Sequence, residues 1–480
     1  MKRGKSMVKK SNLLDNFIIF IFLLMPFFSM SFFHNHLTTL FIVIAVIIIF
    51  LITIYKHLES RKNIKYLFGY FLLVFIYLII NYIRSFNFNS LIPNNYSLLK
   101  ELLTIVKLMM PVLILYSLYY NQIDKKKYFF VINSWIFIIT LCIISTNILK
   151  LSLSSYTSEV ITYNIFEWKS NISYLFTASK GFFMYANQMA VLTIILLLIS
   201  VYEFLYFKKR YFINLFLLMI SMLMLGTRTS ALGGLLVLAF SIIGYIIISV
   251  FNKEQIKYRF LTLCSILIMW IILLPISPFA NRNIELNNYQ NNVVSGININ
   301  IDKNEKINYV YNHYNPNYLP KMFFEDFYKI EYDGDFWYEF IKKNENKNIN
   351  YRFIEESIIK RMIEVNNNKF DILFGISNVR IQNVVNLERD FVLHFYAFGI
   401  IGSFILLLIY GVIFKISFVN LINNKNYFNF VLFSCVCLFL FIAFLTGNIL
   451  NSLIPILQFS FLISRIFLIK KDEKNNSEIL

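Results

Sequence analysis

The sequence predicts an all-α integral membrane protein with about twelve transmembrane helices. Hydrophobic residues make up 58% of the 480 residues and charged residues 15%, where a soluble protein carries about 25% charged residues. Apolar runs of about 20 residues, each long enough to cross a bilayer, recur along nearly the whole chain. The predicted spans cover roughly 14–33, 37–55, 66–83, 102–120, 129–148, 183–207, 211–226, 231–250, 260–278, 391–414, 428–447 and 449–469.

Polar stretches separate the apolar runs and so define the individual spans. The short turn His34 to His36 divides the first two spans, and the fourth span contains Lys107. The turn Gly226 to Gly233 divides the seventh from the eighth, and the polar segment 279–389 precedes the tenth. The cysteines all lie inside apolar runs, which favours small buried residues over a disulfide framework or a metal site. They are Cys142, Cys264, Cys435 and Cys437.

Basic residues predict the orientation in the membrane, because Lys and Arg concentrate in cytoplasmic loops. If the N-terminus is cytoplasmic, the inner segments hold 23 basic and 7 acidic residues, and the outer segment 279–389 holds 14 and 15. Both termini are then expected in the cytoplasm, with the protein in the plasma membrane. The net charge of +18 therefore reports topology, and nucleic-acid binding is not expected. The inner segments are 1–16, 56–65, 121–128, 208–210, 251–259, 415–427 and 470–480.

Three parts of the chain follow from this topology: membrane helices over 1–278, an extracytoplasmic loop domain over 279–389, and the last helices with a cytoplasmic tail over 390–480. The loop is too long for a simple connector. Its first half reads as irregular, but from Ile349 to Val365 apolar residues recur at helical spacing. We therefore expect a small, mainly helical cap between spans nine and ten.

An excess of positive charge is predicted near the outer ends of the spans. Seven basic residues share this zone with four acids, against the usual cytoplasmic bias. Such charges are suited to binding an anion, although long side chains at an interface also extend to the headgroups without further function. The basic residues are Arg84, Lys100, Lys107, Lys150, Lys169, Lys180 and Arg228; the acids are Glu101, Glu159, Glu167 and Asp390.

Short motifs on the predicted outer face resemble, taken together, the O-antigen ligase and polymerase family, in particular its branch in Gram-positive surface-polysaccharide clusters. They are KGFFMYAN over 180–187, GTRTSALG over 226–233, the loop helix opening at Arg352, the turn Phe374-Gly375-Ile376, and LERDFVLHFYAFGIIG over 387–402. The number of spans and the position of the loop match as well, so the resemblance covers most of the chain.

The resemblance implies a metal-independent glycosyl transfer that needs no cofactor. The donor would be a glycan on undecaprenyl diphosphate, and the acceptor a sugar hydroxyl attacked with inversion on the extracytoplasmic face. We expect a surface-polysaccharide polymerase that works among membrane lipids, with a chain-length regulator as a possible partner protein. A ligase that moves the glycan to a lipid, wall or protein anchor is the nearest alternative.

A diphosphate leaving group requires fixed cations, and arginine suits multidentate contact with phosphate oxygens. Arg228 is the first candidate, because it stands at the outer end of two spans with no acid nearby in sequence; it could instead anchor the turn to headgroups. Arg352 is the second, matching the family's loop arginine. The further candidates are Arg361, Lys180 and Arg380.

The attacking hydroxyl requires a general base, and Glu388 is the favoured candidate, followed by Asp390. The ligase branch carries a His-Asn pair near this point, which this sequence lacks. Asp390 could simply cap the tenth span, and His394, the lone histidine here, reads as an interior residue. Gly399 and Gly402 are interpreted as sites of close helix packing.

A flippase for lipid-linked oligosaccharides is the alternative from another class of protein. It would be expected to carry its charges within the spans and to need no large outer domain. Charges at the outer edge, together with the long loop 279–389, favour chemistry on that face. A glycosyltransferase class with acids in a large first outer loop is excluded by the short turn His34 to His36, and a two-span co-polymerase by the number of spans.

Overall fold

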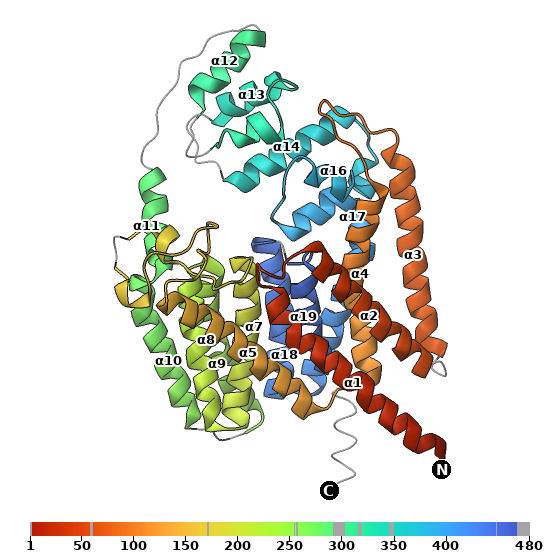
Figure 1. Ribbon diagram of the computed structural model, residues 1–480, viewed down its shortest axis with the longest axis vertical. Helices are drawn as coiled ribbons and strands as arrows, with labels where there is room; N and C mark the ends of the chain where they lie inside the picture. The colour runs from red at the N-terminus through yellow and green to blue at the C-terminus, as the bar shows by residue number, and fades with distance from the viewer. Residues whose placement is uncertain are drawn as a thin grey trace. The chain divides into compact units, whose positions relative to one another are not determined.

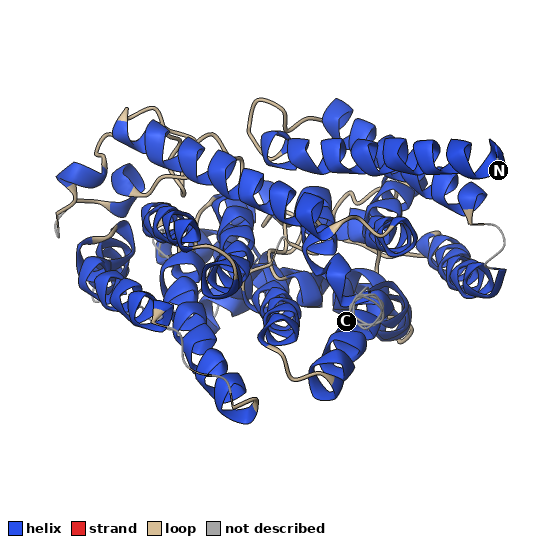
Figure 2. Ribbon diagram, turned by 90° about the horizontal axis from the view of Figure 1, so that it is seen from below, coloured by secondary structure: helices blue, strands red, loops and turns tan. Residues whose placement is uncertain are grey.

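The structure is a computed structural model that describes residues 2–57, 61–169, 172–253, 255, 258–290, 303–314, 319–344, 350–447 and 449–467. Helices dominate these residues, and the described part contains isolated backbone bridges but no strand (Figure 2). The all-α prediction is thus confirmed for the described residues. Much of the irregular half of the predicted loop (291–302) and the predicted tail (470–480) lie outside them.

The chain folds into two compact units. Unit 1 comprises Met1–Ser60, Lys107–Ile284 and Ile409–Leu480, and unit 2 comprises Arg61–Val106 and Glu285–Leu408. Unit 1 contains α1 (Lys2–Phe28), α2 (His36–Lys56), α5 (Lys125–Ile148), α6 (Tyr174–Thr177), α7 (Ala186–Tyr206), α8 (Phe212–Leu225), α9 (Gly234–Phe251), α10 (Arg259–Leu273), α18 (Tyr427–Leu445) and α19 (Leu453–Ile463). Unit 2 contains α3 (Arg61–Ser85), α12 (Lys303–His313), α13 (Gly334–Asn344), α14 (Tyr351–Asn366), α15 (Asp371–Phe374) and α16 (Asn378–Gln382), and three helices cross the division: α4 (Leu98–Asn121), α11 (Pro278–Gln290) and α17 (Asp390–Asn423).

Helix α7 forms the centre of unit 1. It packs against α8, α9 and α18, and α7, α8 and α9 run alongside one another in Figure 1. In the most apolar stretch of α7, which is 18 residues long, 94% of the residues are buried. A helix that is apolar on all sides is either surrounded by protein or faces lipid, and the burial of α7 shows that protein surrounds it.

Nine helices among the described residues are long and apolar enough to cross a membrane. They are α2, α3, α4, α5, α7, α10, α17, α18, and α9 together with the π-helical turn Thr229–Gly233 before it. The predicted count of twelve is not confirmed, because three predicted spans correspond to shorter helices. Leu13–Phe28 and Leu453–Phe467 have fewer than 18 residues, and α8 has 14 residues because Gly226 ends it in a left-handed conformation.

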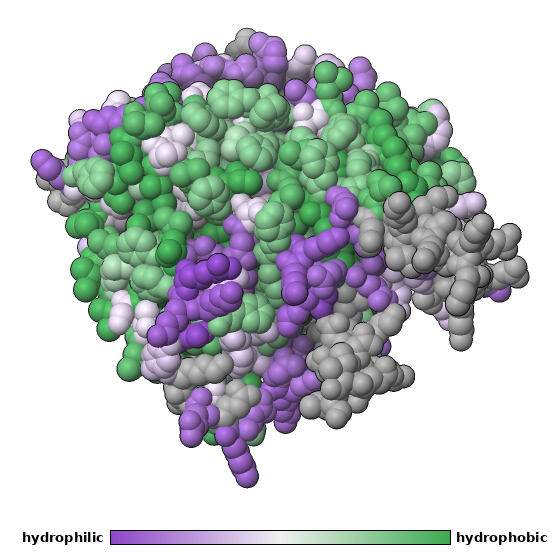
Figure 3. All heavy atoms as spheres, turned by 60° about the horizontal axis from the view of Figure 1, so that its bottom comes forward, coloured by the Kyte–Doolittle hydropathy of each residue, from purple (hydrophilic) through white to green (hydrophobic). Residues whose placement is uncertain are grey.

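Large apolar side chains remain exposed along the outer faces of several of these helices. On α2, Leu40, Ile44, Ile48 and Leu51 are 43–57% exposed and follow one stripe. Apolar side chains, drawn in green, cover a broad area of the face in Figure 3. Continuous apolar surface on this scale would be unusual for a soluble protein and fits contact with lipid.

Unit 2 contains the amphipathic helix predicted over 349–365, which is α14. Ile354, Ile358 and Met362 are buried, as their spacing predicts. The Asn350 side chain caps the first turn, and Asn367 ends the helix in a left-handed conformation with φ of 47°. The predicted helix is confirmed, including its end in the asparagine run.

Helix α17 is not the continuous span predicted over 391–414. Gly399 has φ of 66° and ψ of −174° and breaks the helix. At this break the backbone of Phe374-Gly375-Ile376 crosses α17, and the Ile376 and Ser377 N–H groups donate to the carbonyls of Tyr396 (2.9 Å) and Ala397 (3.0 Å). The prediction that Gly402 permits close packing agrees with its contact with the Tyr77 ring. Gly399 instead permits two backbones to touch.

Candidate functional site

Arg228, the first candidate for the diphosphate, follows a tight turn in unit 1. Gly226 begins this turn with φ of 62°, and a Cβ atom there would lie 2.9 Å from both Ala178 and Pro278. Only glycine fits such a close approach in this conformation. The turn leaves the Arg228 side chain exposed at the start of the helix that continues into α9, with no hydrogen bond or ion pair among the described residues.

Lys180 belongs to the extended segment that packs beside the same turn through Ser179. The Ser179 N–H donates to the carbonyl of Met224 (2.8 Å), and the Lys180 N–H to that of Leu153 (3.0 Å). These contacts hold this segment beside the end of α8. The Lys180 side chain is half-buried, and burial lowers the pKa of its ammonium group. Within the described residues this ammonium group has no carboxylate partner.

Arg282, on α11, is a third cation in this part of unit 1, and it is not among the residues predicted from the sequence. Its Nη1 donates to the Tyr156 hydroxyl (2.9 Å), and its guanidinium lies 4.6 Å from the centre of that ring and 5.9 Å from that of Tyr174. Its Nε is buried without a hydrogen-bond partner in the described part of the chain. The signal in the sequence was its place just beyond the end of a predicted span.

Tyr156 connects Arg282 to the turn before Arg228. Its hydroxyl donates to the carbonyl of Gly226 (2.8 Å). Burial raises the pKa of Tyr156 to about 12, and the positive charges of Arg282 and Arg228 oppose this rise. Both arginines therefore act electrostatically on one phenol. We call Lys180, Arg228 and Arg282 the cation group of unit 1.

Unit 2 brings Arg352 and Glu388 together, although 36 positions separate them in sequence. Arg352 opens α14, and its Nε and Nη2 lie 3.0 Å and 2.9 Å from Oε2 of Glu388. The side chains are 30% and 44% exposed, so the carboxylate remains accessible. The two leading candidates of the segment 279–389 are thus direct partners.

Asp390 and His394 are both closed off from solvent. Asp390 is the first residue of α17 and is 0% exposed, and His394 is 1% exposed. Such burial agrees with the interior position expected for His394. Since a general base must reach its substrate, Glu388 is better placed than Asp390.

Arg361 and Arg380, the other loop candidates, are engaged by the fold of unit 2. Arg361 pairs with Asp333 through two contacts of 2.7 Å and 3.2 Å, and this carboxylate raises the pKa of Arg361. Arg380 donates to the carbonyls of Asn94 (2.6 Å) and Ser85 (2.7 Å). Burial lowers the pKa of Arg380, which is 6% exposed. Both residues tie segments of unit 2 together.

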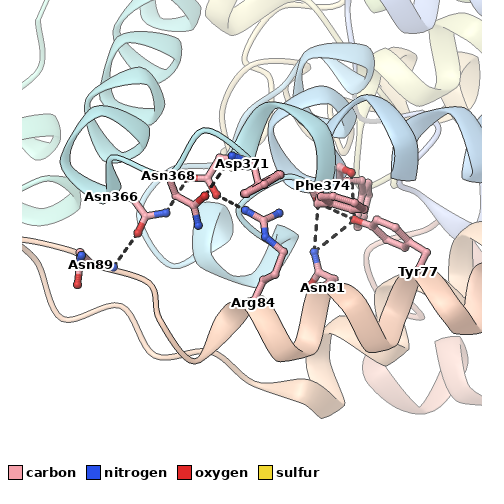
Figure 4. A network of polar contacts seen from close by, with 10 residues as sticks. Tyr77, Asn81, Arg84, Asn89, Asn366, Asn368, Asp371 and Phe374 are labelled. Carbon is pink, nitrogen blue, oxygen red and sulfur yellow. Dashed lines mark hydrogen bonds and ion pairs between the residues drawn. The ribbon is translucent and has the colours of Figure 1, made fainter.

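A polar network joins α3 to the segment after α14 (Figure 4). Arg84 contacts the buried Asp371 at 2.7 Å, and Asn366 donates to the other carboxylate oxygen (2.6 Å). Burial raises the pKa of Asp371, and these two partners oppose that rise. The Tyr77 hydroxyl lies 3.0 Å from the carbonyl of Phe374. Through Tyr77, the network ties α3 to the point where the Phe374-Gly375-Ile376 backbone crosses α17 at Gly399.

Metal-ligand residues do not cluster in the described part of the chain: no group of three or more His, Cys, Asp or Glu side chains there could hold an ion. The four cysteines are free thiols. Two features of the described side chains are suited to chemistry: the cation group of unit 1 can bind an anion, and the accessible carboxylate of Glu388 in unit 2 can accept a proton.

Apolar helices long enough to cross a bilayer and charged groups in the segments between them define an integral membrane protein. Its family follows from comparison with known proteins. The sequence model of the family described as O-antigen ligase like membrane protein matches residues 8–472, and the chain belongs to this family. The predicted family is thereby confirmed. No individual curated protein matches the chain significantly.

Proposed function

We propose that this protein extends a surface polysaccharide by transferring a glycan from a polyprenyl diphosphate to a sugar hydroxyl. Membership of the family supports a lipid-linked glycan as substrate. The observation that carries the proposal is the cation group of unit 1, which has no carboxylate partner among the described residues. Unneutralised cations are suited to a diphosphate, whose negative charge increases as the glycosidic bond breaks.

In this proposal Arg228 binds the diphosphate directly, because its exposed guanidinium has no other partner in the described residues. Arg282, whose Nε is buried without a hydrogen-bond partner among the described residues, adds a second positive charge. Lys180 adds a third positive charge. The polyprenyl chain lies against the exposed apolar faces of the helices, and the reaction takes place on the extracytoplasmic side of the plasma membrane.

Glu388 is the proposed general base. Arg352 orients its carboxylate through two N–H groups, leaving 44% of the side chain exposed. The base removes the proton of the acceptor hydroxyl, the oxygen attacks the anomeric carbon, and the diphosphate leaves with the bonding electrons. Attack from the face opposite the leaving group inverts the anomeric configuration.

The test is transfer by the purified full-length protein in lipid nanodiscs, with a synthetic undecaprenyl-diphosphate-linked oligosaccharide as donor. A polymerase produces a ladder of chains, and a ligase adds one glycan to its acceptor. Arg228→Ala should lower the rate by a factor of about 100 or more. The control is Lys208→Ala, an exposed cation after α7.

Two results would contradict the proposal. If Arg228→Ala and Lys208→Ala transferred glycan at the same rate, the cation group would not be the diphosphate site. If the donor crossed the bilayer with its sugar–phosphate bond intact, the protein would be a flippase.

A further inference from the structure

Two adjacent glutamates on α14, Glu355 and Glu356, face the chain that leads into α17, and their environments differ. Glu356 is well partnered: Arg389 donates to one oxygen, Lys360 Nζ lies 2.9 Å from the other, and Tyr396 adds a contact of 3.4 Å. Burial alone would raise the pKa of Glu356, but Lys360 and Arg389 outweigh it and the pKa is lowered. Glu356 is thus held as a carboxylate.

Glu355 lacks such partners. Its Oε2 is buried and accepts no hydrogen bond in the described part of unit 2. Glu355 accepts a hydrogen bond from the backbone N–H of Glu388, so it lies against the proposed general base. The charged groups that face it are Arg352 on its own helix, and Glu388 and Arg389 in the segment before α17.

This setting favours a proton on Glu355. A buried carboxylate oxygen without a donor is costly when charged, and two neighbouring carboxylates do not both ionise readily. Burial first, and then the charge of Glu388, raise the pKa of Glu355 to about 7, although Arg352 and Arg389 oppose the rise. Near neutral pH the group can therefore both take up and release a proton.

We infer that Glu355 and Glu388 form a carboxyl pair that handles the acceptor proton together, Glu388 removing it from the hydroxyl and Glu355 taking it on. The inference rests on the proposed function. The acceptor O–H bond breaks as its oxygen bonds the anomeric carbon, and the diphosphate leaves with the electron pair of the broken C–O bond. The proton passes from Glu388 to Glu355 and then to solvent, so Glu388 is free for the next transfer.

The experiment follows the initial transfer rate against pH for the full-length protein in nanodiscs. The wild-type rate should rise through a limb near pH 7 as Glu355 loses its resting proton. Glu355→Gln cannot accept a proton, so the rate should fall by a factor of about ten or more and the limb should disappear or move by at least one pH unit. Glu355→Asp keeps a carboxyl group and should restore a limb.

The matched control is Glu364→Gln, on the exposed side of the same helix, which should keep the wild-type profile. A readout that needs no catalysis is the infrared band of a protonated carboxyl group. Its titration near pH 7 should be equally large in wild type and in Glu364→Gln, and smaller by the contribution of one carboxyl group in Glu355→Gln.

Each result separates this inference from the proposed function. If Glu355→Gln keeps the wild-type rate and limb, the relay is overturned and the transferase remains. An infrared titration near pH 7 that is as large in Glu355→Gln as in wild type also overturns it. If wild type transfers no glycan at any pH, the proposed function fails and the relay fails with it, whatever the infrared titration shows.

Discussion

Replacing Gly399 with alanine tests the backbone crossing that shapes unit 2. Gly399 has φ of 66° and ψ of −174°, a region that only glycine adopts readily, and a side chain there costs about 1–3 kcal/mol. The new Cβ would lie 2.4 Å from the Leu373 carbonyl group and the Phe374 nitrogen. These are backbone atoms and cannot rotate away, so overpacking adds about 1–3 kcal/mol. We expect a total loss of about 2–6 kcal/mol.

The measurement is thermal unfolding of the purified full-length protein in detergent. Gly399→Ala should lower the midpoint by about 2–6 °C, because the unfolding entropy of a 480-residue chain corresponds to about 1 kcal/mol per degree. Gly375→Ala should do the same, because its Cβ would lie 2.2 Å from the Ala397 carbonyl oxygen. The control is Gly69→Ala, also in unit 2, whose Cβ would meet nothing within 4 Å. A Gly399→Ala protein that unfolds at the same temperature as Gly69→Ala would refute the reasoning.

Three further substitutions follow from the same contacts. Arg84→Ala leaves the Asp371 carboxylate, which is 3% exposed, without its cation, and should lower the free energy of unfolding by about 3 kcal/mol. Lys306→Ala, which breaks an exposed pair with Asp335, should lower it by less than about 1 kcal/mol. Equal losses of unfolding free energy in the two variants would contradict this reasoning. Glu388→Gln should lower kcat by a factor of about 10²–10⁴ with donor affinity unchanged, and an unchanged kcat in the transfer assay would remove Glu388 from its role. Tyr156→Phe keeps the aromatic ring next to Arg282 but loses the hydroxyl contacts with Arg282 and with the Gly226 carbonyl. The affinity for the donor should therefore fall by a factor of about three to ten. An unchanged affinity would show that the ring alone is enough to position Arg282.

Local features of the sequence predicted local structure well. Helix α14 could be located because Ile354, Ile358 and Met362 repeat at the helical period, and all three are buried. The end of that helix could be predicted because the asparagine run supplies a residue that accepts a left-handed conformation. In such cases the residues that determine the structure lie within one or two turns of one another.

Contacts between distant segments could not be predicted in this way. Glu101 appeared only as one acid near the outer end of a span, yet Ser377 donates to it at 2.8 Å across 276 positions, and the N–H of Val379 donates at 3.0 Å. Hydrophobic periodicity shows which face of a helix is covered, but it does not identify the partner. For the same reason Glu355 was missed, because its significance depends on Glu388 from another segment.

The candidate arginines show how partner contacts decide function. The sequence placed Arg352 ahead of Arg361 and Arg380 because it opens the loop helix and matches the family's loop arginine, but the sequence did not reveal the partner of any of the three. The charge of Arg361 is neutralised by the 3% exposed Asp333, so Arg361 has little attraction left for a second anion, and substituting it should reduce stability more than donor affinity. A cation without a carboxylate partner keeps its full charge available to an incoming anion. Among the described residues Arg228 meets that condition, which is why the proposed diphosphate site rests on unit 1.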